Sequence, residues 1–349
     1  MGHPGHFLPP NATAYRRTPA RCRVYRRRTM DQDAKMVEIR TLFGVDAPEG
    51  AGVFVGKGSR VINHGYIFNK RILRKVLSWF DGEPGFQNLG VVGNAGVGKT
   101  TLLKEFSARM GVEFRSVSVS GDTRFESLCG RREIKNGSTE YVEQGLAEMF
   151  RQGGVFCANE FFRMDAGEAM RMVEFLDEGG SLTNPETGEV IPRHPDFRFC
   201  FTGNSGGFGD ETGAYAGERR GSFALRDRFF ILELPEMTAC EEQAMLVRAV
   251  PQLENTPFAE RMVAAARAVR AAFVGRGGGL PVDVSPRALV RWGNLFVSPA
   301  YQAYNTGNGV MSNPLLESLG DACLNGAPQD AREAVMELVG QWLGLDTEF

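Results

Sequence analysis

Apolar positions along this chain follow two periods, and the two alternate between about residue 67 and residue 237. Short continuous apolar runs are typical of buried strands, whereas apolar residues three and four positions apart indicate helices. The expected strands are residues 89–92, 113–120, 154–158, 197–202 and 229–233. The expected helices include 67–80, one beginning near Thr100, 143–152 and 166–177. Strands that alternate with helices predict an α/β fold with a parallel sheet.

Two hairpins interrupt this pattern. Asn136-Gly137 is a strong signal for a two-residue hairpin turn, and a second hairpin is expected to turn near Thr187-Gly188. From residue 238 onward the pattern is mostly helical, which predicts a small separate lid. The predicted organisation is a disordered Arg-rich tail at 1–35, an N-terminal arm at 36–66, an α/β nucleotide-binding domain at 67–237, and a helical lid with C-terminal helices at 238–349.

The charge of the chain is unevenly distributed. The net charge is −2, but residues 1–30 contain seven arginines and no acid, so the rest carries about −9 by subtraction. A nucleic-acid arm or a transit peptide would have this composition. A disordered tail, or translation from a start upstream of Met30, explains it equally simply, because the stretch lacks the apolar periodicity that folding needs.

Composition also narrows the class of protein. The chain is 42% hydrophobic and 23% charged, with no run near the roughly 18–20 apolar residues of a membrane span. Its six cysteines are scattered without C-x-x-C spacing, and its four histidines form no ligand pattern. We therefore expect a cytoplasmic protein without a zinc site or a disulfide framework.

Residues 93–100 read GNAGVGKT and match G-x-x-x-x-G-K-[ST] between an expected strand and an expected helix. In such a loop, backbone N–H groups surround the phosphates, Lys99 reaches the β- and γ-phosphates, and the Thr100 hydroxyl binds Mg²⁺. The alternative is a chance glycine turn before a helix. The candidate ATP-binding residues are Gly93, Asn94, Ala95, Gly96, Val97, Gly98, Lys99, Thr100 and Thr101.

Two further strands end on polar side chains. The apolar strand in GGVFCANE ends on Asn159 and Glu160, and the strand FRFCFT is followed by Asn204. Ligand groups in parallel sheets gather at the carboxyl ends of the strands, so Glu160 is a candidate general base and Asn204 a candidate holder of the attacking water. The candidate metal residues are Thr100, Asn159 and Glu160. The alternatives are that Glu160 is an exposed carboxylate at the end of a strand and that Asn204 is an ordinary loop amide.

Three arginines complete the set of candidates. Arg226 and Arg228 lie just before the strand at 229–233, where a surface salt bridge with Asp227 or another acid is the alternative role. Ser285 and Pro286 are expected to start a lid helix, which would direct Arg287 toward a bound nucleotide. A solvent-facing arginine in the first turn is the alternative there.

With these motifs in this order, the chain resembles the AAA+ ATPases, and within them the MoxR-like group and the CobS-like small subunits of aerobic cobaltochelatases. The resemblance covers roughly residues 37–300. Beyond the motifs, it rests on IRTLFGVD at 39–46, VIPRHPDFRF at 190–199, GFGDETGAYAG at 207–217 and VSPRALVRW at 284–292.

The resemblance implies an AAA+ fold with two hairpin insertions, a hexameric ring, and a partner protein with a von Willebrand A-type domain. It implies that Arg228, or next Arg226, reaches the neighbouring subunit's site as an arginine finger. The chain departs from the family at Asn159, where the family has Asp. An amide there brings no negative charge to Mg²⁺, so slower turnover is expected.

Three functions follow as hypotheses. The first is an ATP-hydrolysing ring that remodels or activates a partner protein, in a metal-chelatase complex or elsewhere. The second is an ATP-gated assembly with little hydrolysis because of Asn159. The third is a nucleic-acid motor, but the first hairpin holds three basic and three acidic residues, so any nucleic-acid contact is expected through the basic tail.

Overall fold

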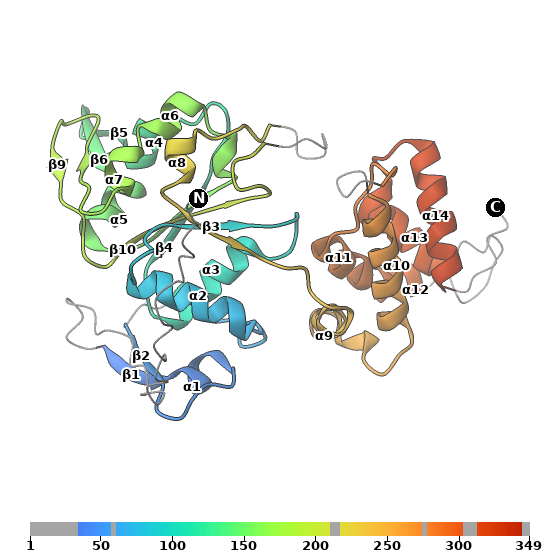
Figure 1. Cartoon of the computed structure of the whole chain (residues 1–349). Coiled ribbons are helices and arrows are strands. Elements are labelled where there is room, and N and C mark those ends of the chain that lie inside the picture. The colour runs from blue at the N-terminus through green and yellow to red at the C-terminus, as the bar shows by residue number, and fades with distance from the viewer. Residues whose placement is uncertain (1–33, 57–60, 210–216, 274–277, 303–312, 344–349) are drawn as a thin grey trace, which may run out of the picture.

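The structure is a computed structural model that describes residues 34–56, 61–209, 217–273, 278–302 and 313–343. Its centre is a five-stranded parallel sheet in the order β11-β3-β10-β7-β4 (Figure 1). The strands are β3 (Leu89–Val92), β4 (Phe114–Ser118), β7 (Gly154–Asn159), β10 (Phe197–Gly203) and β11 (Phe230–Glu233). The predicted parallel α/β sheet is confirmed, and each strand lies within two residues of its expected bounds.

Helices cover both faces of this sheet. Phe199 and Phe201 of β10 face a layer formed by α4 (Phe125–Cys129), α5 (Leu146–Gln152), α6 (Ala166–Met170) and α7 (Val173–Leu176). Cys200, between them, faces α2 (Lys70–Asp81) and α3 (Lys99–Arg109) on the other side. Burial on both faces is why these strands read as continuous apolar runs rather than as alternating ones.

Three helices differ from their expected bounds. The helix expected at 143–152 begins at Leu146, because residues up to Glu143 form a strand. The helix expected at 67–80 begins at Lys70, because the Asn69 side chain accepts hydrogen bonds from Arg71 N (3.0 Å) and Ile72 N (3.3 Å) and caps it. The helix expected at 166–177 is divided into α6 and α7, where Arg171 N and Met172 N donate three residues back instead of four. Such i→i−3 bonds tighten the turn and end α6.

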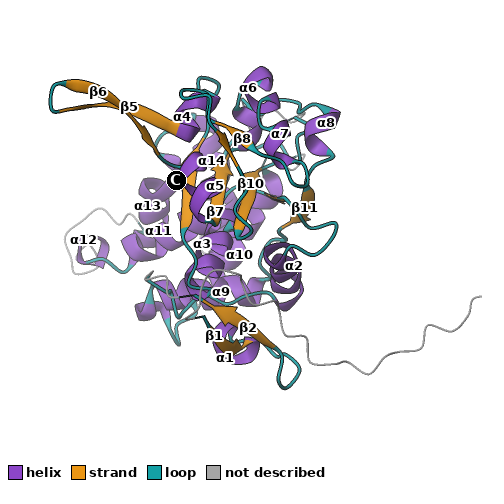
Figure 2. Ribbon diagram, turned by 90° about the vertical axis from the view of Figure 1, so that its left-hand side faces the viewer, coloured by secondary structure: helices purple, strands orange, loops and turns teal. Residues whose placement is uncertain are grey.

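Both predicted hairpins are present. β5 (Gly130–Lys135) pairs with β6 (Ser138–Glu143), and Asn136 and Gly137 both have positive φ, as the two central residues of a type I′ turn require. The second hairpin is shorter, with β8 (Leu182–Thr183) pairing with β9 (Val190–Ile191). Figure 2 shows that β5 and β6 project well away from the body of the molecule.

The N-terminal arm packs against α3. Its strands β1 (Lys35–Glu38) and β2 (Gly52–Val55) are antiparallel, and α1 (Ile39–Phe43) follows β1 directly. Phe43 stacks on Phe106 of α3 with ring centroids 5.7 Å apart, and Arg109 Nη1 donates to Leu42 O at 2.9 Å. The predicted Arg-rich tail falls mainly on residues 1–33, which lie outside the described residues.

The C-terminal helices have a hydrophobic core of their own, and the prediction that this region is helical is confirmed (Figure 1). Trp292 is fully buried in it, and its indole Nε1 donates to Leu315 O at 2.9 Å. The elements are α9 (Ala239–Ala249), α10 (Phe258–Ala272), α11 (Pro286–Phe296), α12 (Pro299–Gln302), α13 (Pro314–Leu319), a π-turn (Gly320–Leu324) and α14 (Gln329–Leu343). Three short helical elements complete the described chain: 3₁₀ turns at Phe161–Arg163 and Pro251–Leu253, and α8 (Phe223–Arg226). No helix among the described residues is long and apolar enough to cross a membrane.

Candidate functional site

The turn between β3 and α3 is built on glycines with left-handed backbone angles. Gly98 has φ +93° and precedes α3, so no side chain caps the N–H groups of the first helical turn. Gly96 has φ +80°, and a Cβ there would lie 2.9 Å from the Cβ of Ser285. Uncapped N–H groups at the start of a helix attract anions. The turn therefore has the backbone of a phosphate-binding loop, and the other predicted loop residues, Gly93, Asn94, Ala95, Val97 and Thr101, lie in it or at the start of α3.

Lys99 is buried at the centre of this loop, and three oxygens hold its ammonium group. Its Nζ donates to two carbonyl oxygens of the loop, at 2.6 and 3.0 Å, and to Asn204 Oδ1 at 3.0 Å. Burial lowers the pKa of Lys99, and the negative charges of Glu160 and Glu218 oppose that shift. An ammonium group held by neutral oxygens would gain more from the charged oxygens of a phosphate, because charge-assisted hydrogen bonds are stronger.

Asn159, the last residue of β7, uses its side-chain oxygen to join three elements. Its Oδ1 accepts from Thr100 Oγ1 at 2.8 Å and from Thr202 Oγ1 at 3.0 Å, and Cys157 Sγ lies 3.7 Å away. Thr202 is in range because β10 pairs it with Asn159 directly. Thr100 Oγ1 and Asn159 Oδ1 are thus neighbouring oxygen atoms, and oxygen is the ligand type that suits Mg²⁺. The residues present fit this cation.

Glu160 follows β7 with φ +60°, an uncommon angle for a residue with a side chain. Its carbonyl oxygen accepts from Arg163 N at 2.9 Å and starts the turn Phe161–Arg163. Its carboxylate faces the side chain of the same arginine, with Oε2 and Nε 3.4 Å apart. Neither of these two atoms makes a hydrogen bond with a described residue. The contact is therefore an ion pair without a hydrogen bond between these two atoms.

The carboxyl ends of three adjacent strands therefore meet at the phosphate loop. β3 leads into Lys99 and Thr100, β7 ends with Asn159 and Glu160, and β10 leads into Asn204. Parallel pairing places these ends at one edge of the sheet. The tertiary fold brings together all five of these predicted side chains.

Two of the predicted arginines have partners outside the set of side chains at this edge. Arg228 precedes β11 and so lies at the amino end of the strands, where its guanidinium donates to Asp177 through Nε (2.6 Å) and Nη2 (3.1 Å). Arg226 lies over the ring of Phe208, 4.3 Å from its centroid. Within the described part of the chain, neither side chain makes a hydrogen bond or an ion pair with Lys99 or Glu160.

The lid approaches the phosphate loop at the start of α11. Ser285 caps this helix by accepting from Ala288 N at 3.3 Å, as the sequence predicts, and it also lies against Gly96. Arg287 is exposed in the first turn of the same helix. Its side chain is therefore exposed at the helix start where the lid approaches the phosphate loop.

Comparison with known proteins agrees with this geometry. Residues 88–229, which include four of the five strands of the sheet and every polar strand end described above, match the family described as "AAA domain (dynein-related subfamily)". This segment is similar to the AAA domains. The chain is also 27% identical over 270 residues to "Aerobic cobaltochelatase subunit CobS" of Sinorhizobium sp, a match that covers 73% of this chain and 79% of that protein. The predicted resemblance to AAA+ ATPases of the CobS type is confirmed.

Two further similarities have a lower sequence identity or cover less of this chain. An uncharacterised protein of Staphylococcus haemolyticus is 30% identical over 154 residues, which cover 42% of this chain and 55% of that protein. Among solved structures, a point mutant of RuvB from Thermotoga maritima superimposes with a TM-score of 0.48 at 16% identity, covering 80% of this chain and 84% of that one.

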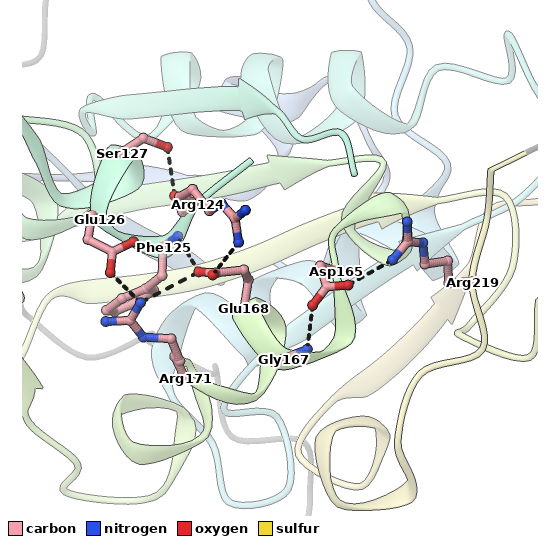
Figure 3. A network of polar contacts seen from close by, with 9 residues as sticks. All are labelled: Arg124, Phe125, Glu126, Ser127, Asp165, Gly167, Glu168, Arg171 and Arg219. Atoms are coloured by element: carbon pink, nitrogen blue, oxygen red, sulfur yellow. Dashed lines mark hydrogen bonds and ion pairs between the residues drawn. The ribbon is translucent and has the colours of Figure 1, made fainter. Parts of the chain in front are cut away.

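A polar network joins α4, the helix that leads into the long hairpin, to α6 (Figure 3). The N-terminus of α4 lacks a cap from its own sequence, and Glu168 of α6 supplies one by accepting from Phe125 N at 2.9 Å. Arg124 binds the same carboxylate at 3.0 Å, and Arg171 pairs with Glu126. In the same view Asp165 binds Arg219 at 2.9 Å. These contacts connect α4 and the hairpin after it to the segment that follows Glu160.

Three side chains around the site were missed by sequence reasoning: Thr202, Arg163 and Glu218. Thr202 had a usable signal, because it is a polar side chain near the end of the apolar strand that leads into Asn204. Arg163 and Glu218 had none. Their contacts depend on a tight turn and on a loop that returns to the sheet edge from 14 residues along the chain.

Replacing Asn159 by aspartate is expected to raise the apparent affinity for Mg²⁺ by about 10- to 100-fold, the range typical of groups that orient a metal site. The added negative charge lies beside the Thr100 hydroxyl, where a cation would bind. Mg²⁺ titrations of nucleotide binding and of ATP turnover would measure the shift. Asn294→Asp, on the exposed side of α11, is the matched control. Equal Mg²⁺ dependence in the wild type and Asn159→Asp would exclude a role for this residue in metal binding.

Proposed function

We propose that this AAA+ protein hydrolyses Mg²⁺-ATP and uses the energy to remodel or activate a partner protein. One observation supports hydrolysis above all others: Lys99 Nζ and Asn204 Oδ1 are hydrogen-bonded at 3.0 Å beside the end of the Glu160 strand. A phosphate-binding cation, a water-holding amide and a carboxylate base are thereby adjacent. Phosphoryl transfer to water needs these three groups.

Each side chain has a distinct task in this proposal. Lys99 binds the β- and γ-phosphates and neutralises charge on them, while Asn204 holds the attacking water. Glu160 separates from Arg163 and accepts a proton from that water, whose oxygen then attacks the γ-phosphorus. The bond between the γ-phosphorus and the β,γ-bridging oxygen breaks, and ADP and phosphate are the products. Thr100 and Asn159 would hold Mg²⁺, which would offset the negative charge of the phosphates.

We further propose a homo-oligomeric ring, hexameric by resemblance. The arginines support it: Arg228 and Arg226 have partners other than the chain's own Lys99, and an arginine finger supplied by a neighbouring copy would complete the site. Arg287 would reach the nucleotide from the lid of its own chain.

CobS is by name a cobaltochelatase subunit. For this chain we propose a von Willebrand A-type partner and, with it, a chelatase complex. The five described cysteines are free, which supports a reducing compartment such as the cytoplasm.

An ATP-gated assembly with little turnover is the second candidate. Two observations favour it: the residue beside Glu160 is the neutral Asn159, and Glu160 itself is paired with Arg163. In this case ATP would bind and assemble the ring, and hydrolysis would be slow until a partner separates that ion pair.

The test of nucleotide binding is Lys99→Ala. We expect its affinity for ATP to fall by about 10- to 100-fold, because a charged hydrogen-bonding group is lost from the phosphate site. Isothermal titration of the full chain with ATP measures this, and light scattering of the same samples reports assembly. Lys104→Ala, on the exposed face of the same helix, is the control. If Lys99→Ala binds ATP as tightly as Lys104→Ala does, the assigned site is wrong.

A further inference from the structure

Glu218 binds the turn that carries Asn204. Its Oε1 accepts from Asn204 N at 2.6 Å, and its Oε2 accepts from Ser205 N at 3.1 Å. Both N–H groups lie beyond the last residue of β10, where ladder hydrogen bonds end. Hydrogen bonds from backbone N–H groups to a carboxylate are charge-assisted and strong. Glu218 therefore sets the backbone position from which the Asn204 side chain extends.

The position of Asn204 matters because its amide contacts the phosphate-binding lysine. Its Oδ1 accepts from Lys99 Nζ at 3.0 Å. In the proposed ATPase, the γ-phosphate and the attacking water have to fit beside this contact. The carboxylate of Glu218 also lies near enough to Lys99 to raise the pKa of that residue against the effect of burial. One side chain thus affects both the amide and the ammonium group.

Glu218 is itself held by the segment that follows Glu160. The next residue, Arg219, donates its N–H to Phe162 O at 2.7 Å and its guanidinium to Asp165 Oδ2 at 2.9 Å (Figure 3). Phe162 belongs to the turn that Glu160 starts. The location of the Glu218 carboxylate therefore depends on the conformation of that turn.

We propose that Glu218 is a positioning residue for ATP hydrolysis, which holds Asn204 in the place where it orients the attacking water and couples that place to the turn after Glu160. The inference rests on the proposed ATPase function. Glu218 touches neither nucleotide nor water in this role; it acts through Asn204.

The test is Glu218→Gln in the full chain. Glutamine keeps the length of the side chain and one acceptor oxygen but removes the charge that strengthens both hydrogen bonds. We expect kcat to fall about tenfold, the difference between charged and neutral hydrogen bonds, with KM for ATP changed less than about twofold. Glu254→Gln, an exposed carboxylate of the lid, is the control for charge. Thermal unfolding of each variant verifies that the fold is retained.

A double-mutant cycle separates positioning from a general structural role. If Glu218 acts through Asn204, the change Glu218→Gln has no further effect on kcat once Asn204→Ala is present. Multiplying effects of the two substitutions, or wild-type kcat in Glu218→Gln, would overturn the proposal. These outcomes require a wild type that turns over faster than Glu160→Gln. Without that difference the ATPase function itself fails, so the two failures are distinct.

Discussion

Replacing Glu160 by glutamine is expected to lower kcat for ATP hydrolysis by about 10²- to 10⁴-fold, the usual contribution of a general base. Glutamine has the same shape but cannot accept the proton of the attacking water. The ion pair with Arg163 is lost as well, but that pair lacks a hydrogen bond and its loss costs little stability. ATP binding is expected to remain, because Lys99 and the loop backbone are unchanged.

Phosphate release at steady state measures this effect, and ATP titration of the same preparation checks binding. Glu174→Gln, an exposed carboxylate on α7, is the matched control and is expected to behave as the wild type. Two outcomes separate the functional candidates. Turnover in the wild type well above that of Glu160→Gln supports hydrolysis, whereas equal and negligible turnover would remove it and leave the ATP-gated assembly.

Phe201→Ala is expected to lower the free energy of unfolding by about 3–5 kcal/mol, as truncation of a fully buried phenylalanine does. The Phe201 ring lies 5.2 Å from each of the rings of Phe161 and Phe162 and 4.7 Å from that of Phe229. It also fills the space beside Gly90, where a Cβ would come within 2.4 Å of it. A cavity at Phe201 would therefore lie directly beneath the turn that follows Glu160.

Urea unfolding followed by circular dichroism measures the change for the full chain. Phe223→Ala removes the same side chain from a position that is 75% exposed and is expected to shift stability by less than about 0.5 kcal/mol. Because Phe161 and Phe162 follow Glu160 directly, we expect Phe201→Ala to reduce ATP turnover in the folded protein as well. A loss of stability no larger than that of Phe223→Ala would show that the aromatic cluster does not support the site.

Short sequence motifs predicted those parts of the structure that depend on interactions between neighbouring residues. Asn136-Gly137 predicts its hairpin because both residues readily adopt positive φ. Ser285 and Pro286 predict the start of α11 because one supplies a cap and the other has a helical φ and no N–H to satisfy. The phosphate loop predicts its own backbone, since Gly96 and Gly98 adopt angles that side chains disfavour.

Helix bounds were predicted less accurately where contacts with residues distant in the sequence override what the neighbouring residues favour. The helix expected at 166–177 is periodic throughout, yet it is divided at Arg171, whose side chain pairs with Glu126 of another helix. Likewise α4 begins at Phe125 although its own Ncap, Arg124, offers no acceptor, because Glu168 accepts that N–H from 43 residues away. Neither partner is visible in a window of neighbouring residues.

The sequence by itself determined the parallel α/β sheet, the hairpins, the helical C-terminal region and the identity of Lys99, Asn159, Glu160 and Asn204 as polar ends of particular strands. Each depends on periodicity or on a short motif, which neighbouring residues specify. Only the tertiary structure decided that Thr202 shares the Asn159 oxygen with Thr100, that Arg163 pairs with Glu160, that Arg228 binds Asp177, and that Glu218 holds the Asn204 turn. These contacts depend on strand register and on returning loops, and hydrogen bonds of about 3 Å form only where the whole fold has fixed both partners.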